Sequence, residues 1–120
     1  MHKKILLISR HAPYGNSIAK DALDAALAAA IYDQDLSMLF MDDGIFQLLR
    51  DQQAQEISQK NFTSMLSALP FYDIDKLYIH QESLEQRGLT IENLIVDNAT
   101  IVNSAQIPNL LNHQDHILSF

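Results

Sequence analysis

The sequence contains no cysteine among its 120 residues. Without a thiol, the chain can form neither a disulfide nor a thiolate metal site, and it has no thiol nucleophile. Five histidines remain as potential metal ligands, but only the pair His113-x-x-His116 has a ligand-like spacing. We expect this pair to lie at a turn between a helix and a strand, so we predict no metal site. We also predict no other cofactor.

Long apolar runs and clusters of basic residues are missing too. No run approaches the roughly 20 apolar residues of a membrane-spanning helix. The apolar run at residues 5–8 is too short for a secretory signal. Eight basic residues face fifteen acidic ones, giving a formal net charge of −7, and no lysine or arginine follows Arg87. Because nucleic-acid-binding domains normally present a basic face to phosphates, we expect no direct contact with nucleic acid. The lack of a spanning run and of a secretory signal predicts a cytoplasmic protein without membrane contact.

Short apolar segments alternate along the chain with segments of helical pattern. The apolar residues of the expected strands are continuous rather than alternating, which is typical of a parallel sheet covered on both faces. The expected strands cover residues 3–9, 36–41, 76–79, 94–96 (with pairing resuming near 101–102) and 116–120. The expected helices cover residues 18–31, 62–69, 81–88 and 104–112, and residues 45–49 form a short apolar helix or turn.

This alternation, with short connections, predicts an α/β fold. The length fits one domain, residues 1–120, with a core of ordinary size. We predict a three-layer, flavodoxin-like sandwich with a mainly parallel sheet of about five strands. In such a fold functional groups gather at the carboxyl ends of the strands. The only three glycines of the chain, Gly15, Gly44 and Gly88, all follow expected strands, which indicates tight turns at this edge.

His80 stands at the end of the third expected strand, where a reactive side chain would be placed. It could act as a general base, accept a phosphoryl group, or stand in for a lost nucleophile. It could equally be a polar residue at a strand end that bonds to a neighbouring loop. We favour this structural interpretation, because the local sequence fixes no carboxylate beside His80. Glu82 is near, but we expect it on the following helical turn.

Residues 10–17 follow the first strand, where flavodoxin-like folds hold phosphate in front of a helix N-terminus. This segment lacks a run of glycine, serine and threonine, and Pro13 removes one backbone donor. A structural turn is therefore favoured over a phosphate site. Arg10 and His11 are expected to face a partner instead.

Asp42-Asp43-Gly44 follows the second strand. Paired carboxylates at a strand end can bind a divalent cation, but adjacent aspartates on an extended segment cannot easily point at one ion. We favour a capping role for one of them on a helix that opens at Gly44. The apolar residues 45–49 fit either the core or a contact with another subunit.

The sequence resembles the DsrE/DsrF-like family over essentially its whole length, and within it most closely the TusC (DsrF) type of subunit. The motifs that carry the resemblance are Ala12-Pro13-Tyr14-Gly15, the helix region 24–28, Met41-Asp42-Asp43-Gly44-Ile45-Phe46-Gln47-Leu48-Leu49, Tyr72-Asp73-Ile74, residues 83–89 and Ile117-Leu118-Ser119-Phe120. The segment from Asp43 to Leu49 is the most specific of these motifs.

The resemblance implies a place in a sulfur relay. In this family three homologous subunits, of the TusB, TusC and TusD types, form a hexamer with two copies of each. The complex passes persulfide sulfur to a TusE-like protein, and from there to the enzyme that makes 2-thiouridine at the tRNA wobble position. Related Dsr complexes act in sulfur oxidation.

The sulfur-carrying cysteine of this family belongs to the TusD (DsrE) type. It lies at the end of the third strand, eight residues before the glycine that ends the next helix. The equivalent position here is His80, eight residues before Gly88. Because an imidazole cannot carry persulfide sulfur as a thiolate does, the resemblance implies a non-catalytic subunit.

Two function classes therefore remain open. One is a non-catalytic relay subunit, for tRNA thiolation or alternatively for sulfur oxidation. The other is a stand-alone small-molecule-binding protein that uses His80 and the first loop. For the relay subunit, the candidate partner contacts are Arg10, His11, Tyr14, Asp43, Ile45, Phe46 and His80.

Overall fold

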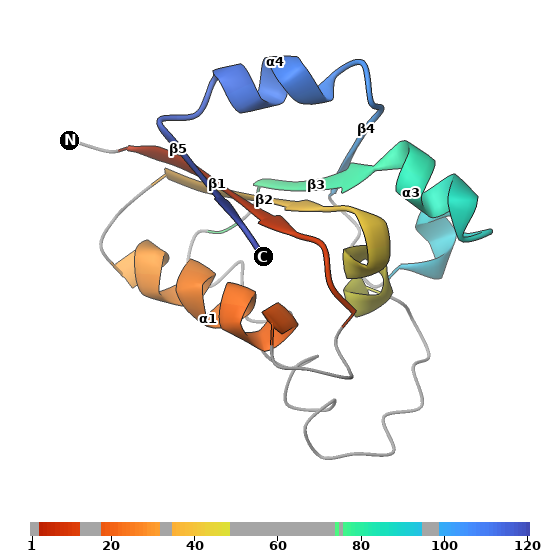
Figure 1. Cartoon of the computed structure of the whole chain (residues 1–120), viewed down its shortest axis with the longest axis horizontal. Helices are drawn as coiled ribbons and strands as arrows, with labels where there is room; N and C mark the ends of the chain where they lie inside the picture. The colour runs from red at the N-terminus through yellow and green to blue at the C-terminus, as the bar shows by residue number, and fades with distance from the viewer. Residues whose placement is uncertain (1–2, 13–17, 32–34, 49–73, 75, 95–98) are drawn as a thin grey trace.

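A computed structural model describes residues 3–12, 18–31, 35–48, 74, 76–94 and 99–120. Five strands form one sheet in the order β4-β3-β2-β1-β5, and every neighbouring pair is parallel (Figure 1). The strands are β1 (Lys4–Ser9), β2 (Asp35–Phe40), β3 (Lys76–His80), β4 (Thr100–Val102) and β5 (His116–Ser119). The predicted α/β fold with a five-stranded parallel sheet is confirmed.

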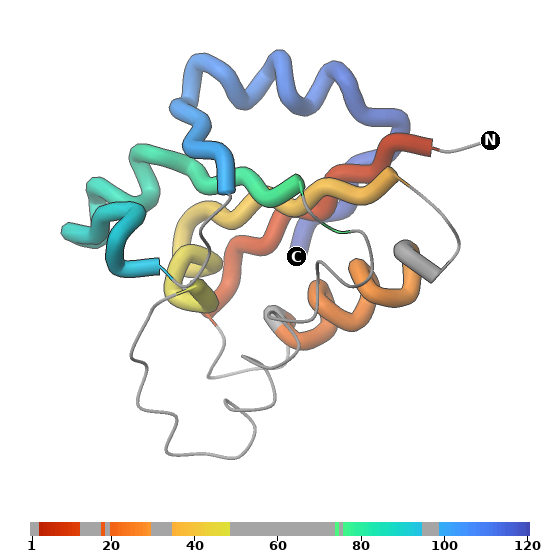
Figure 2. The backbone as a smooth tube through the Cα atoms, turned by 180° about the vertical axis from the view of Figure 1, so that it is seen from behind, coloured from red at the N-terminus to blue at the C-terminus, as the bar shows by residue number. Residues whose placement is uncertain are grey.

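Helices flank this sheet on both faces. The described helices are α1 (Ile18–Ile31), the 3-10 helix η1 (Asp42–Leu48), α3 (Gln81–Gln86), the 3-10 helix η3 (Ile91–Asn93) and α4 (Ile107–Asn112). Helices α1 and α4 lie on opposite faces, while η1 and α3 lie at the edge where β2 and β3 end (Figures 1 and 2). None of the described helices is long and apolar enough to cross a membrane.

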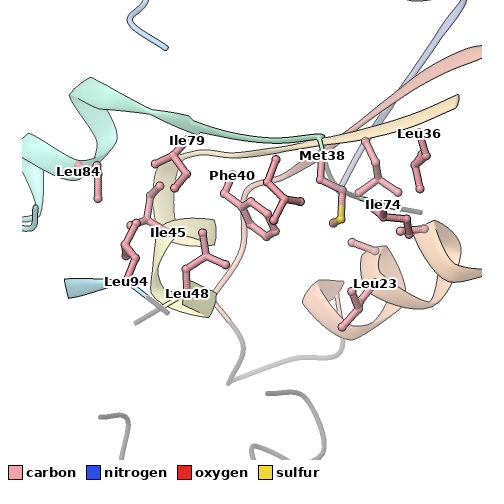
Figure 3. Packing of buried hydrophobic residues seen from close by; sticks show 14 residues of the cluster. Leu23, Leu36, Met38, Phe40, Ile45, Leu48, Ile74, Ile79, Leu84 and Leu94 are labelled. Atoms are coloured by element: carbon pink, nitrogen blue, oxygen red, sulfur yellow. The ribbon is translucent and has the colours of Figure 1, made fainter. Parts of the chain in front are cut away.

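Alternate strand residues feed two hydrophobic cores. Phe40 and Ile79 belong to the larger core, between the sheet, α1 and η1 (Figure 3). Helix α1 contributes Ala22, Leu23 and Ala26, whose helical spacing predicted this contact. Residues on the other face form a smaller core with the apolar side of α4, made by Leu6, Leu39 and Val102 with Ile107, Leu110 and Leu111.

Gly88 closes the helix after β3, as expected: the last helical residue of α3 is Gln86, and Arg87 is its C-cap. The amides of Gly88 and Leu89 donate to the carbonyls of Glu85 and Leu84, at 3.1 and 3.0 Å. Gly88 has a φ of +66°, a left-handed conformation that glycine adopts without strain. This turn leads the chain away from the carboxyl edge of the sheet.

The pairing expected near 101–102 is confirmed by β4. Of the strand expected at 94–96, Leu94 is an extended β-bridge residue that is fully buried in the larger core, and the structure does not describe residues 95 and 96. Residues 95–98 lie outside the described residues, as does the helix predicted at 62–69. Helix α4 begins at Ile107 and not at residue 104, because the side chains of Asn103 and Gln106 each bond the other's backbone amide and form a turn.

Candidate functional site

His80 ends β3 and caps the N-terminus of α3 with an extended backbone, at φ −74° and ψ 118°. Nδ1 of its ring lies 2.6 Å from Oγ of Ser83, and Nε2 lies 2.8 Å from Oγ of Ser104. The side chain is 12% exposed. Both ring nitrogens are therefore occupied by hydroxyl groups, one from α3 and one from the loop after β4.

Ser83 links this histidine to the end of β2. The serine is buried, at 1% exposure, and its Oγ accepts a 2.9 Å hydrogen bond from the backbone amide of Asp42. The hydroxyl proton is left for Nδ1 of His80. Since Asp42 opens η1 while Ser83 lies in α3, this one hydroxyl ties together the segments that follow β2 and β3.

Glu82 lies beside His80. Its Oε1 is 3.8 Å from Nε2 of His80, and its Oε2 accepts a 2.8 Å bond from the amide of Ser104. Hydrogen bonds from the hydroxyl and the amide of Ser104 lower the pKa of Glu82 below its ordinary value, and partial desolvation opposes this shift. Glu82 lies on the helical turn after β3, as expected, and it is held beside His80 by Ser104, a residue 22 positions away that the local sequence does not reveal.

The lowered pKa of Glu82 predicts a stability that depends on pH. The ionised carboxylate stabilises the folded chain above the ordinary pKa of 4.5, and this contribution is lost as the pH falls through the lower folded value. Glu82→Gln should therefore be less stable than wild type at pH 7, and the difference should shrink in acid. Urea unfolding of both proteins from pH 7 down to values below the ordinary pKa of 4.5 measures the difference in stability. Glu85→Gln, at an exposed position of the same helix, is the control. Parallel wild-type and Glu82→Gln curves would contradict the prediction.

The two aspartates after β2 have separate partners. Asp42 Oδ2 lies 3.2 Å from Nε of Arg10, and Asp43 Oδ1 lies 2.9 Å from a terminal nitrogen of Arg87. The 3-10 helix already begins at Asp42, so neither aspartate caps a helix that opens at Gly44, as the sequence had suggested. Within the described ranges no three His, Cys, Asp or Glu side chains are grouped to hold a metal ion.

Arg87 joins several parts of this edge. Besides its bond to Asp43, it donates a 3.1 Å hydrogen bond to the carbonyl of Ser83. Its guanidinium group also lies over the ring of Phe46, 5.8 Å from the centroid, a cation–π arrangement. The arginine thus fixes α3 against η1 and covers one face of the partly buried Phe46.

Gln47 positions the residues after β1. It is buried, and its Nε2 donates to Oγ of Ser9 at 2.6 Å and to the carbonyl of His11 at 2.8 Å. Arg10 and His11 are thereby held next to η1. The carboxyl ends of β1, β2 and β3 are joined into one hydrogen-bonded edge.

The candidate contact residues are mostly brought together at this edge. Arg10, His11, Asp43, Phe46 and His80 all lie there. Ile45 is fully buried in the larger core, so its side chain is not available to a partner, and we remove it from the set. Tyr14 lies outside the described residues.

Sequence reasoning missed Ser83, Ser104 and Arg87. The spacing of Ser83, three residues after a strand-end histidine, is a local signal of a helix-start contact that could have been used. Ser104 and Arg87 carry no such signal, because their partners are distant in the sequence and meet only through the parallel pairing of β3 with β2 and β4.

Comparisons with known proteins agree with this architecture. The model of the DsrE/DsrF-like family matches residues 3–120. The chain is 37% identical to the intracellular sulfur oxidation protein DsrF of Allochromatium vinosum, over 98% of this chain and 96% of that protein. It is also 37% identical to a TusC homolog of Vibrio vulnificus, over 98% of both chains.

A solved structure shows the same fold. The ychN protein of E. coli superposes with a TM-score of 0.81 over 100% of both chains, at 24% sequence identity. Together with the family match and the two relatives, the fold establishes that this chain belongs to the DsrE/DsrF-like family, among its TusC and DsrF relatives.

Proposed function

We propose that this chain is a non-catalytic subunit of a TusBCD-type sulfur-relay complex that passes persulfide sulfur towards 2-thiouridine at the tRNA wobble position. The similarity to proteins named TusC and DsrF over nearly the whole chain supports a relay subunit. We propose cytoplasmic TusB-like and TusD-like partners, with two copies of each subunit, and a TusE-like acceptor reached through the complex.

The observation that carries this proposal is the histidine at the end of β3 in a chain without cysteine. To carry sulfur, a thiolate must attack a persulfide sulfur and keep it in a new S–S bond. The ring of His80 offers no such bond, and serine hydroxyls occupy both of its nitrogens. The sulfur-carrying group must then belong to another subunit.

The exposed groups of this edge are the proposed contact surface. Asp43 and Arg10 have side chains that are 60% and 53% exposed, and Phe46 is partly buried beneath Arg87. His11 and His80, both less exposed, complete the set. A rigid, hydrogen-bonded edge suits this role, because a preformed surface loses little conformational entropy when a partner docks.

Wobble uridine modification in a strain that lacks the gene tests the proposal. We expect 2-thiouridine in total tRNA to fall strongly and to return when the wild-type gene is supplied. His80→Ala should restore most of the modification, provided that co-purification shows an assembled complex. Unchanged 2-thiouridine in the deletion strain would contradict the tRNA role. A large loss with an assembled His80→Ala complex would show that the histidine assists the partner's thiolate.

A second candidate function is a DsrF-type subunit in sulfur oxidation. The similarity to the Allochromatium vinosum relative, an intracellular sulfur oxidation protein, favours it. The same deletion strain separates the two functions. Loss of sulfur oxidation with normal 2-thiouridine supports the second, and the reverse supports the first.

A further inference from the structure

The sheet face towards α4 changes character halfway along its strands. Its carboxyl half is apolar and packs against α4. Its amino half carries four polar residues in adjacent register positions, since Lys4 pairs with Asp35 and Ser37 pairs with Lys76. A central parallel sheet is normally apolar on both faces. This polar patch therefore needs an explanation other than core packing.

A cavity of about 670 Å³ lies over the patch. On the side of the sheet, the cavity is lined by the four polar residues and Tyr78. On the opposite side it is lined by α4 and the residues next to it, including Gln106, Asn109 and His113. Helix α4 stands over this face in both views (Figures 1 and 2). The volume is in the range of small-molecule sites, roughly 300–1,000 Å³.

The charges in the cavity are unequal. Nζ of Lys76 lies 2.8 and 3.1 Å from the two carboxylate oxygens of Asp35, so these two charges balance. Nζ of Lys4 makes no hydrogen bond or ion pair with the described chain. Lys4 lines the cavity, and its ammonium group has no ion pair within the described ranges, in a chain whose net charge is −7. The nearby carboxylate of Asp115 accepts a 2.8 Å bond from the backbone amide of Lys4.

Neutral polar groups line the same cavity as Lys4. The hydroxyls of Ser37 and Tyr78 and the side-chain amide of Asn109 line the cavity, and none has a hydrogen-bond partner within the described ranges. Ser37 is only 5% exposed. Its hydroxyl is nevertheless not one of the fully buried polar atoms that lack a hydrogen-bond partner in the described ranges, so we infer that it is accessible from the cavity. These groups can donate hydrogen bonds to one oxygen-rich ligand.

We propose that this cavity binds a small organic anion that carries a carboxylate or phosphate group. Lys4 supplies the charge, and Ser37, Tyr78 and Asn109 supply hydrogen bonds. The site lies at the amino ends of β1, β2 and β3, at the opposite end of the sheet from His80. It does not depend on the proposed relay function.

Titration of the full chain with inorganic phosphate and, separately, with succinate tests the proposal. Two-dimensional NMR of the side-chain amides reports directly on Asn109 and Gln106. At least one probe should give saturable chemical-shift changes at the side-chain amides of Asn109 and Gln106 and at the backbone amide of Tyr78, with a Kd in the millimolar range or tighter. A response to phosphate alone identifies a phosphate ligand, and a response to succinate alone identifies a carboxylate.

Three variants sharpen the test. Lys4→Met should weaken binding about tenfold. Lys20→Met removes the same charge from the exposed side of α1, where it pairs with Asp24, and should leave binding unchanged. Asp35→Asn removes the carboxylate charge that lies 2.8 Å from Nζ of Lys76 and makes the cavity more positive, so it should tighten binding severalfold, an outcome that a merely structural role for Asp35 would not give. No saturable shift with either probe, or equal affinity in Lys4→Met and wild type, would overturn the proposal.

Discussion

Gly44→Ala is expected to destabilise the fold by more than about 3 kcal/mol, enough to unfold much of the chain. A Cβ at this position would overlap the carbonyl oxygen of Ser9 and lie 2.8 Å from its carbonyl carbon. Both atoms are backbone, so no side-chain rotation can relieve the overlap. The start of η1 would have to move away from the end of β1, although buried core residues such as Ile45 hold it in place.

Gly88→Ala is the matched control for this prediction. Gly88 has a positive φ, but a Cβ there would meet nothing within 4 Å. Only backbone strain is then added, and the expected cost is about 1 kcal/mol. Urea unfolding of both variants measures the difference. Equal stability losses in the two variants would show that the backbone of η1 at Gly44 does not lie in close contact with the backbone of Ser9 at the end of β1.

Ser83→Ala is expected to cost about 2 kcal/mol, because it leaves two groups without their hydrogen-bond partner. The buried hydroxyl accepts from the amide of Asp42 and bonds Nδ1 of His80, so both would lose it in the variant. Replacing the hydroxyl by a hydrogen removes only one heavy atom and changes the volume little. The loss therefore measures the hydrogen bonds rather than a cavity.

Ser104→Ala is the control, because Ser104 bonds the other nitrogen of the same ring but is exposed. Water can replace its hydroxyl at both His80 and Glu82, and the amide of Ser104 still bonds Glu82 in the variant, so we expect a loss of at most about 0.5 kcal/mol. Thermal unfolding of both variants separates the two serines. If Ser104→Ala were the more damaging of the two, the anchor of His80 would lie in the loop after β4 and not in α3.

The sequence was sufficient to predict the sheet because its signals were local. Continuous apolar runs marked β1, β2 and β3, and the spacing of Ala22, Leu23 and Ala26 marked the buried side of α1. The sequence did not decide between the segments of Leu94 and Ile101 as the main part of the fourth strand, because both are similarly apolar. Only pairing with β3, in the register Ile79 to Ile101, distinguishes the strand.

The candidate site was predictable in its location but not in its bonding. The end of β3 pointed to His80, and the glycine after β2 pointed to the turn at Asp42 and Asp43. The contacts of His80 with Ser104, and of Asp43 with Arg87, join residues 24 and 44 positions apart. Such contacts follow from strand order, which the sequence pattern does not determine.

The proposed function implies that the sulfur-carrying group and its support belong to different subunits. In this chain the carboxyl edge is fixed by serine, arginine and glutamine side chains, and it ends in a histidine where the resemblance places a cysteine in the sulfur carrier. An edge of this kind can support a partner's reactive group without having one. Under the proposed function, sulfur transfer would require assembly with a cysteine-bearing subunit.

The native mass of the protein purified from its own cells, with identification of every co-purifying chain, tests this account most directly. We expect a hetero-oligomer that contains a homologous subunit with a cysteine at the end of its third strand. A lone monomer or homodimer, with no cysteine-bearing homologue bound, would contradict the account.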